Sequence, residues 1–312
     1  MPVDAAFADL LANPRMALRE PPAHIDISVL RHAADAFLAA GSGPALNAVT
    51  DLMADEQQAI PLRLYRPTAD AGLPVIVFIH GGGFVFGSIE THDAVCRILA
   101  SRSGAAVLSI GYCLAPEFDV AFALDDCLTA VRWLIETAPA LKLDSSRLAI
   151  VGDSAGGYLA ICTAMAAARE GILLRHMGLL YPMIDPHSDT PSAREFAEGY
   201  MLTRGFVEWC WRVSNAAGGQ LACTPLGATR ADLPPTTVVT AQYDMLRDEG
   251  EAFASHLKRE GIATTLCRYD GMIHGFAGFP QRTSQADEAI RQIASACANS
   301  LENHTDAPFP DR

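Results

Sequence analysis

Apolar runs and amphipathic stretches alternate along most of this chain. Short apolar runs at 74–80, 105–112 and 147–151 predict buried strands, and the stretches between them have the apolar spacing of helices. The alternation continues to the end of the chain, with expected helices at 90–102, 123–137, 155–170, 247–260 and near 283–300, and further strands at 177–184, 236–243 and 263–269. Strands that alternate with helices favour an α/β fold, in which a mostly parallel sheet has helices on both faces.

Two regions depart from this alternation. Residues 5–40 are amphipathic with a helical period, and the segments 46–54 and 59–67 alternate as two strands that could pair. Residues 186–220 form an aromatic-rich helical insert. Insertions at the carboxyl ends of parallel strands usually cover a ligand crevice, although an ordinary extra core helix is also compatible with this pattern.

Composition narrows the range of partners. The chain has 312 residues, half of them apolar, and a formal charge of −13, which does not suit a surface for nucleic acid or anionic lipid. Asp4 and Asp9 interrupt the apolar residues of the N-terminal stretch, which has no basic region and does not read as a signal peptide. The eight cysteines show no metal-ligand spacing. We therefore expect reduced thiols, no metal, no stable membrane association and a cytoplasmic location.

A first glycine cluster, HGGG at 80–83, follows the apolar run at 74–80. A P-loop would require Lys and Ser or Thr after Gly87, where the chain has Ser88 and Ile89. A dinucleotide fingerprint would require glycine at the position of Phe86. Neither phosphate-binding motif is present.

The second cluster contains a serine. Gly152-Asp153-Ser154-Ala155-Gly156 lies between a predicted strand and an alanine-rich helix, which is the context of a nucleophile elbow. Such a turn is tight, so we expect Ser154 in a strained backbone conformation, with small neighbours that let strand and helix approach each other. Ser154 is therefore the candidate nucleophile.

A serine nucleophile needs a base and an orienting acid, which follow it along the chain in α/β-hydrolases. His274 comes directly after a predicted strand, in a glycine-flanked loop, and is the preferred base. Asp244, at the end of the strand 236–243, is the preferred acid. Asp248 is the alternative acid, although a place in the first turn of a helix suits a structural role.

These assignments give the first glycine cluster an interpretation. Attack on an ester creates an oxyanion, which is stabilised by the N–H after the nucleophile and by N–H groups of the loop after the third strand. We expect Ala155, Gly82 and Gly83 to be these donors, with glycine required because a Cβ would obstruct the reacting carbonyl. His80 is expected to organise the loop.

Together the motifs resemble the hormone-sensitive-lipase family of α/β-hydrolase esterases, particularly its bacterial members. HGGGF, GDSAGG, YDMLRDEGEAF and DGMIHGF occur in family order. The chain departs from the usual family pattern at Cys113, at 118–121 and at Met245. We expect these departures to leave the Ser-His-Asp set intact and to alter the rim of the active site.

The resemblance implies an α/β-hydrolase fold with an eight-stranded core sheet in residues 46–185 and 221–301. It also implies a helical cap, built from residues 1–45 and the insert 186–220, that forms the substrate pockets. The tail at 302–312 is expected to be flexible. Candidate pocket contacts in the cap are Tyr200, Phe206 and Trp209, whose helical spacing is equally compatible with packing inside the cap. Phe84 and Phe276, which flank the two catalytic loops, are further candidates.

The expected function is a serine carboxylesterase that hydrolyses small esters of short acyl chains through an acyl-enzyme, without a cofactor. A lipase, an acyltransferase or an amidase would use the same site, and a ligand-binding receptor would use the same fold. The lack of a long amphipathic lid disfavours a lipase. A receptor is disfavoured because the plant gibberellin receptors that resemble this family lack the catalytic histidine, whereas this chain has His274. The sequence leaves monomer and homodimer open.

Overall fold

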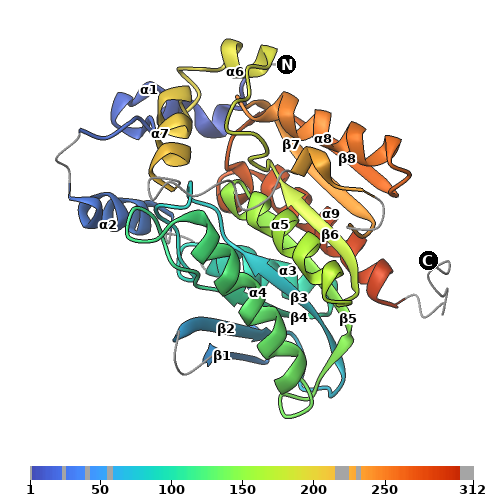
Figure 1. The fold of residues 1–312 in the computed structure, drawn as a ribbon. Coiled ribbons are helices and arrows are strands. Elements are labelled where there is room, and N and C mark those ends of the chain that lie inside the picture. The colour runs from blue at the N-terminus through green and yellow to red at the C-terminus, as the bar shows by residue number, and fades with distance from the viewer. Residues whose placement is uncertain are drawn as a thin grey trace.

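A mixed eight-stranded sheet forms the centre of the computed structural model, which describes residues 2–22, 26–38, 43–54, 59–214, 225–229 and 233–302. The strand order is β1-β2-β4-β3-β5-β6-β7-β8 (Figure 1). The strands are β1 Ala48–Ala54, β2 Ile60–Arg66, β3 Leu73–Ile79, β4 Ala106–Ile110, β5 Leu143–Asp153, β6 Leu174–Leu180, β7 Thr236–Tyr243 and β8 Thr264–Ile273. Strand β2 pairs antiparallel with β1 and β4, and the other neighbours pair in parallel. The predicted mostly parallel sheet and the N-terminal strand pair are confirmed.

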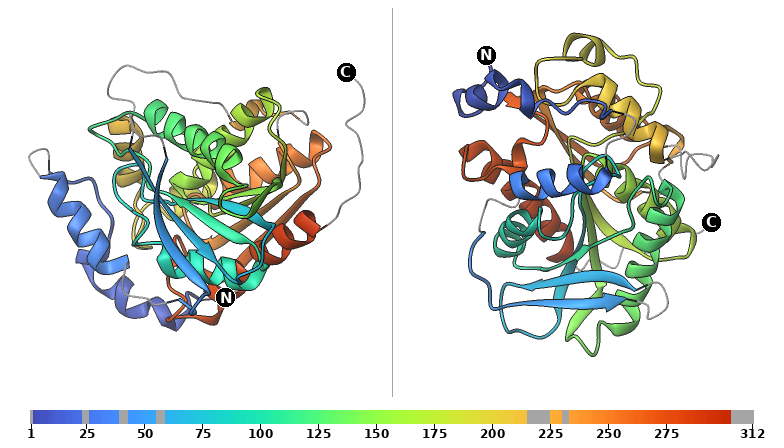
Figure 2. Two further views of the ribbon diagram at one scale, coloured as in Figure 1. Left: turned by 90° about the horizontal axis from the view of Figure 1, so that it is seen from below. Right: turned by 90° about the vertical axis from the view of Figure 1, so that its left-hand side faces the viewer.

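Two layers of helices cover the sheet (Figure 2). Helices α3 Asp93–Ser103 and α9 Ser284–Glu302 pack on one face, and α4 Val120–Thr137, α5 Ala155–Arg169 and α8 Arg247–Arg259 pack on the other. Side chains of β3 alternate between the two cores: Ile76 and Phe78 face the α3–α9 side, while Val77 and Ile79 face the opposite side. A strand that is buried on both faces is apolar at every position, which explains the continuous apolar run seen in the sequence.

The remaining helices form the side of the molecule that we call the cap (Figure 1). They are α1 Ala8–Ala12, α2 Ile27–Leu38, α6 Pro191–Glu195 and α7 Arg204–Ser214. Short 3-10 turns lie at Ala5–Phe7, Pro14–Met16, Pro225–Gly227 and Phe276–Gly278. The expectation of a helical region over 5–40 is too simple, since α1 is short and the segment 13–22 that follows it contains only a single 3-10 turn. Pro14, Pro21 and Pro22 lack the backbone N–H that a continuing helix requires.

The segment 13–22 joins the N-terminal part of the cap to the insert that contains α6 and α7. Leu18 forms an isolated parallel bridge with Leu202, and its N–H donates to the carbonyl of Met201 at 2.7 Å. The predicted insert contains α6 and α7 within its described part, and residues 303–312 of the predicted tail lie outside the described residues. The domain boundaries stay a prediction.

Cysteine chemistry differs in part from the expectation. Among the described residues, six cysteines have free thiols: Cys96, Cys113, Cys127, Cys210, Cys267 and Cys297. Cys162 on α5 is disulfide-bonded, so the prediction of reduced thiols throughout the chain is wrong for this residue. Within the described part of the chain, no helix combines the length and apolar character needed to cross a membrane.

Candidate active site

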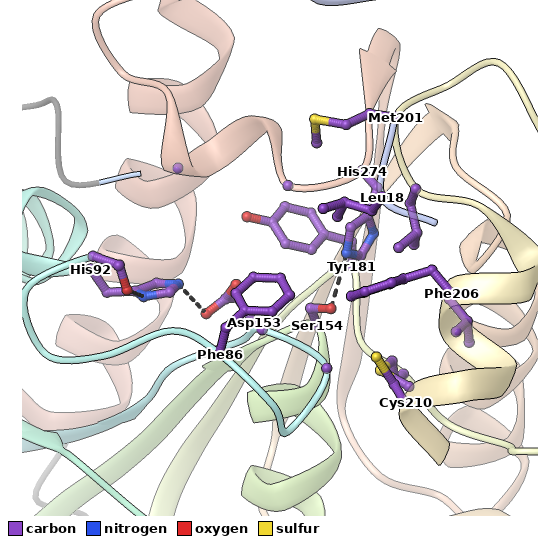
Figure 3. Close-up of a pocket in the computed structure, with 18 of the residues that line it drawn as sticks. Leu18, Phe86, His92, Asp153, Ser154, Tyr181, Met201, Phe206, Cys210 and His274 are labelled. Carbon is purple, nitrogen blue, oxygen red and sulfur yellow. Dashed lines mark hydrogen bonds and ion pairs between the residues drawn. The ribbon is translucent and has the colours of Figure 1, made fainter. Parts of the chain in front are cut away.

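The carboxyl ends of β5, β7 and β8 bring three predicted site residues together. Ser154, Asp244 and His274 each directly follow one of these strands, and all three side chains are buried. The Ser154 hydroxyl lies 2.9 Å from Nε2 of His274 (Figure 3), and Nδ1 of the same ring lies 2.7 Å from Oδ2 of Asp244. Because an ionised carboxylate only accepts hydrogen bonds, Nδ1 carries the proton and Nε2 is free to accept one from serine. This arrangement can activate a hydroxyl for nucleophilic attack.

The backbone at Ser154 has the geometry of an elbow. Its φ is 52° and its ψ is −121°, a conformation that costs a residue with a Cβ about 1–3 kcal/mol. The turn is held by the Ser154 N–H, which donates to Leu180, and by its carbonyl, which accepts from Gly157 and Met183. A Cβ at Gly156 would collide with the carbonyl oxygen of Ile79. The predicted strain and the close approach of strand and helix are therefore confirmed.

Asp248, the alternative acid, lies elsewhere. Its Oδ2 accepts from the Ser192 N–H and its Oδ1 from Arg247 Nε, each at 2.8 Å. Partial burial raises the pKa of Asp248, but the hydrogen bonds from Arg247 and Ser192 outweigh it, so the pKa is lowered. The Asp248 carboxylate therefore ties the start of α8 to α6 in the cap.

The loop after β3 presents backbone donors beside the serine. Gly82 and Gly83 line the pocket above Ser154, and Ala155 is the first residue of α5. Their N–H groups have no hydrogen-bond acceptor among the described residues. Gly82 has a φ of 118°, and a Cβ there would collide with the carbonyl oxygen of Phe86, whereas a Cβ on Gly83 would collide with Cys210. Glycine is thus required by the turn itself and by the cap, a different reason from the expected obstruction of the substrate.

His80 is buried inside this loop. Its Nδ1–H donates to the Gly81 carbonyl at 2.8 Å, its ring stacks on Tyr112 at 4.3 Å, and the Tyr112 hydroxyl donates to the His80 carbonyl. Burial, together with the neighbouring His92, lowers the pKa of His80 to about 3. A neutral ring held in this way organises the loop, as predicted.

A pocket lies above the serine, with walls from both the core and the cap. Figure 3 shows Phe86 and His92 on one side of Ser154, and Phe206 and Cys210 on the other. The cap contributes an apolar wall made of Leu18, Met201, Leu202, Phe206, Val207 and Cys210. The core side contains polar groups as well, including Thr91, His92 and Asp153.

One of the five predicted aromatic contacts, Phe206, lines this pocket. The others pack behind its wall: Phe84 against Tyr158 and Trp211, Tyr200 on Tyr243, Trp209 against Phe206, and Phe276 against Tyr181. Sequence reasoning missed Leu18, which reaches the pocket only through its bridge to Leu202. It also missed Asp153 and His92, although the place of Asp153 beside the nucleophile was a usable signal. The described residues contain no group of three His, Cys, Asp or Glu side chains arranged to hold a metal ion.

Comparison with known proteins agrees with this fold. A family model described as the α/β hydrolase fold matches residues 76–278. The chain is 34% identical to an ethyl acetate hydrolase of Pseudomonas putida, over 95% of this chain and 98% of that protein. It is 35% identical to the carboxylesterase NlhH of Mycobacterium tuberculosis, over 78% of this chain and 79% of that one. The solved structure of a hyperthermophilic esterase from Pyrobaculum calidifontis superposes with a TM-score of 0.87 at 35% identity, covering 96% of this chain and 99% of the esterase. The chain belongs to the α/β-hydrolase-fold family of the hormone-sensitive-lipase type.

Proposed function

We propose that this protein is a serine carboxylesterase in which Ser154 is the nucleophile, His274 the general base and Asp244 the orienting acid. The observation that carries the proposal is the continuous hydrogen-bonded chain from the Ser154 hydroxyl through the imidazole to the Asp244 carboxylate. Ester hydrolysis is supported by the relatives, which are named as an ethyl acetate hydrolase and a carboxylesterase.

The geometry leads to a two-step reaction. His274 Nε2 takes the hydroxyl proton as Ser154 Oγ attacks the ester carbonyl, and the N–H groups of Ala155, Gly82 and Gly83 stabilise the oxyanion. The tetrahedral intermediate then collapses, and the alcohol leaves with the proton from His274. Water attacks the resulting acyl-serine with His274 again as base, which releases the carboxylic acid and restores the serine.

Short acyl chains are the proposed substrates. The apolar wall of Leu18, Met201 and Phe206 bounds the pocket above the serine. A bounded pocket gains about 0.8 kcal/mol for each CH₂ that it buries and nothing for those that stay outside. Acyl groups of about two to eight carbons should therefore be preferred. Efficient hydrolysis of an emulsified long-chain triglyceride would contradict this preference.

The proposal is tested with a fluorophosphonate probe and mass spectrometry. The probe should modify Ser154 alone, and Ser154→Ala should abolish both labelling and the hydrolysis of p-nitrophenyl acetate. Ser255→Ala, which removes an exposed hydroxyl on α8, is the matched control and should leave both unchanged. Near wild-type hydrolysis by Ser154→Ala would refute the assignment.

A cytoplasmic location is part of the same proposal. It is supported by the six free thiols, because exported proteins tend to carry paired cysteines. The Cys162 disulfide points the other way. Cell fractionation followed by immunoblotting tests the location: the protein should be recovered in the cytoplasmic fraction, and recovery outside that fraction would refute it.

A further inference from the structure

Asp153, the residue before the nucleophile, carries a second carboxylate at this site. It is buried, and its Oδ1 accepts the backbone N–H of Gly81 at 2.8 Å. The same oxygen lies 3.2 Å from Nε2 of His92 (Figure 3). Gly81 directly precedes Gly82 and Gly83, and Asp153 belongs to the elbow that continues into Ala155. One carboxylate therefore joins the two segments that hold the proposed oxyanion donors.

Contact between these groups also accounts for glycine at position 81. A Cβ on Gly81 would lie 2.5 Å from Asp153 Oδ2 and 2.8 Å from the Asp153 carbonyl oxygen. Any side chain would push the loop away from the elbow. The loop and the elbow are thus held in van der Waals contact as well as by the hydrogen bond.

The hydrogen-bond partners of His92 indicate a doubly protonated ring. Nδ1 lies 2.8 Å from Thr91 Oγ1, and that hydroxyl donates its hydrogen to the Ser88 carbonyl while it accepts the Ser88 N–H. Thr91 is then left as an acceptor towards Nδ1, and the Asp153 carboxylate is an acceptor towards Nε2. With the Thr91 hydrogen on the Ser88 carbonyl, both ring nitrogens of His92 face acceptors and donate to them, which is the imidazolium form paired with Asp153.

The surroundings agree with a charged pair. Burial lowers the pKa of His92, but the Asp153 charge and hydrogen bond outweigh it, so the pKa is raised. Burial raises the pKa of Asp153, but the charge and the hydrogen bond of His92 have the larger effect, so the pKa of Asp153 is lowered. The His80 ring stacks on His92, and Tyr112, Tyr181 and Cys96 interact electrostatically with Asp153. Burial keeps each of them in its neutral form at neutral pH, because it lowers the pKa of His80 and raises the pKa of Tyr112, Tyr181 and Cys96.

We propose that the Asp153–His92 ion pair is a positioning device for the oxyanion hole. His92 stands at the N-cap of α3, a rigid element, and holds the Asp153 carboxylate against Gly81. The carboxylate then sets the position of Gly82 and Gly83 relative to Ala155. Neither His92 nor Asp153 exchanges a proton with the substrate. This inference rests on the proposed function and adds two positioning residues to it.

The test is His92→Gln, which removes the charge but keeps an amide able to donate to Asp153. Activity is expressed per active site, counted with the fluorophosphonate probe, so that loss of folded protein does not enter. Misplaced oxyanion donors stabilise the transition state less well but leave the binding of the ester unchanged. The kcat should therefore fall about 10- to 100-fold, while the KM for p-nitrophenyl acetate stays within about twofold. His32→Gln, on the exposed face of α2, is the matched control and should behave as wild type.

The pH profile separates positioning from a structural role. Wild-type kcat should decline as the pH rises through the raised pKa of His92, because the imidazolium is then lost. Glutamine does not titrate, so His92→Gln should lack this alkaline decline. A folded His92→Gln enzyme with wild-type kcat per site and an unchanged profile would overturn the inference.

A second variant tests the inference if His92→Gln does not fold. Thr91→Val removes the acceptor of His92 Nδ1–H, so the alkaline decline should begin at lower pH, and a wild-type profile in this variant would also overturn the inference. Activity in Ser154→Ala would refute the proposed function whatever these variants show, so the two failures can be told apart.

Discussion

Oδ2 of Asp244 lies 2.7 Å from Nδ1 of His274, although thirty residues separate the two in the chain. The other oxygen of Asp244 accepts the N–H of Leu246 at 2.9 Å, which holds the carboxylate at the end of β7. Asp248 lies four residues further on, within α8, and faces Ser192 and Arg247 instead. The end of the strand and the first turn of the helix therefore give these two aspartates different surroundings and different expected roles.

The two aspartates should respond differently to removal of charge. Asp244→Asn should keep the fold but favour the wrong tautomer of His274, and by analogy with the serine-protease triad kcat should fall by about 10⁴. Asp248→Asn should instead cost about 1 kcal/mol of stability, because a charged group near a helix N-terminus is lost. Measuring kcat and thermal midpoint on both variants checks this. If Asp248→Asn is the folded but inactive protein, the acid has been misassigned.

Phe206 should limit the length of the acyl chain. It lines the pocket and packs against Phe86 and Trp209. Phe206→Ala should open the apolar wall and raise the preference for longer chains by about fourfold for each additional CH₂ that is buried. The measurement is kcat/KM for nitrophenyl acetate, butyrate, hexanoate and octanoate. Phe122→Ala, at an exposed phenylalanine of α4, should leave the ratios unchanged. An unaltered octanoate-to-acetate ratio in a folded Phe206→Ala protein would exclude Phe206 from the acyl wall.

Glu249 should make stability depend on pH. Burial raises its pKa to about 8, and its Oε1 accepts the N–H of Ile184 at 2.8 Å. The folded protein keeps this proton where the unfolded chain has already released it, so stability falls as the pH rises from about 4.5 to about 8. Glu249→Gln keeps an acceptor for Ile184 and does not titrate.

The Glu249→Gln protein should therefore gain in thermal midpoint relative to wild type as the pH is raised from about 5 to about 8. Thermal unfolding of both proteins across this range is the measurement. The control is Glu136→Gln, at an exposed position of α4, which should show no such trend. A constant difference between wild type and Glu249→Gln would show that the folded protein does not hold this carboxyl in its protonated form.

Arg31 should couple α2 to the active-site loop. Its guanidinium donates to the carbonyls of Val85 at 2.8 Å and Ala115 at 2.9 Å, and makes a two-pronged pair with Glu117. Lysine cannot reproduce this fork, so Arg31→Lys should lower the thermal midpoint by about 2–4 °C and reduce kcat/KM several-fold. Arg15→Lys, at an exposed arginine of the N-terminal segment, should change neither quantity. Wild-type values of both quantities in Arg31→Lys would show that α2 does not support the loop.

The sequence alone was sufficient for the sheet, the order of its strands and helices along the chain, and the three residues that meet above it. Strand β3 is buried on both faces, so its apolar run from Val75 to Ile79 is a local signal that depends on no distant partner. Ser154, Asp244 and His274 follow strand ends, and the carboxyl ends of parallel strands share one edge of a sheet. Their convergence follows from topology.

The pocket wall and its charged pair were decided by the tertiary structure. Leu18 reaches the pocket through a backbone bridge to Leu202, and such a bridge depends on how the cap packs and not on side-chain pattern. Of the predicted aromatics in the insert, Phe206 lines the wall whereas Tyr200 and Trp209 pack behind it, because helical spacing tells which residues share a face but not what that face meets. Phe84 and Phe276 flank the catalytic loops in the sequence, but their rings pack against other aromatic side chains instead. His92 and Asp153 lie in separate segments of the chain, and only the fold brings their side chains together as an ion pair.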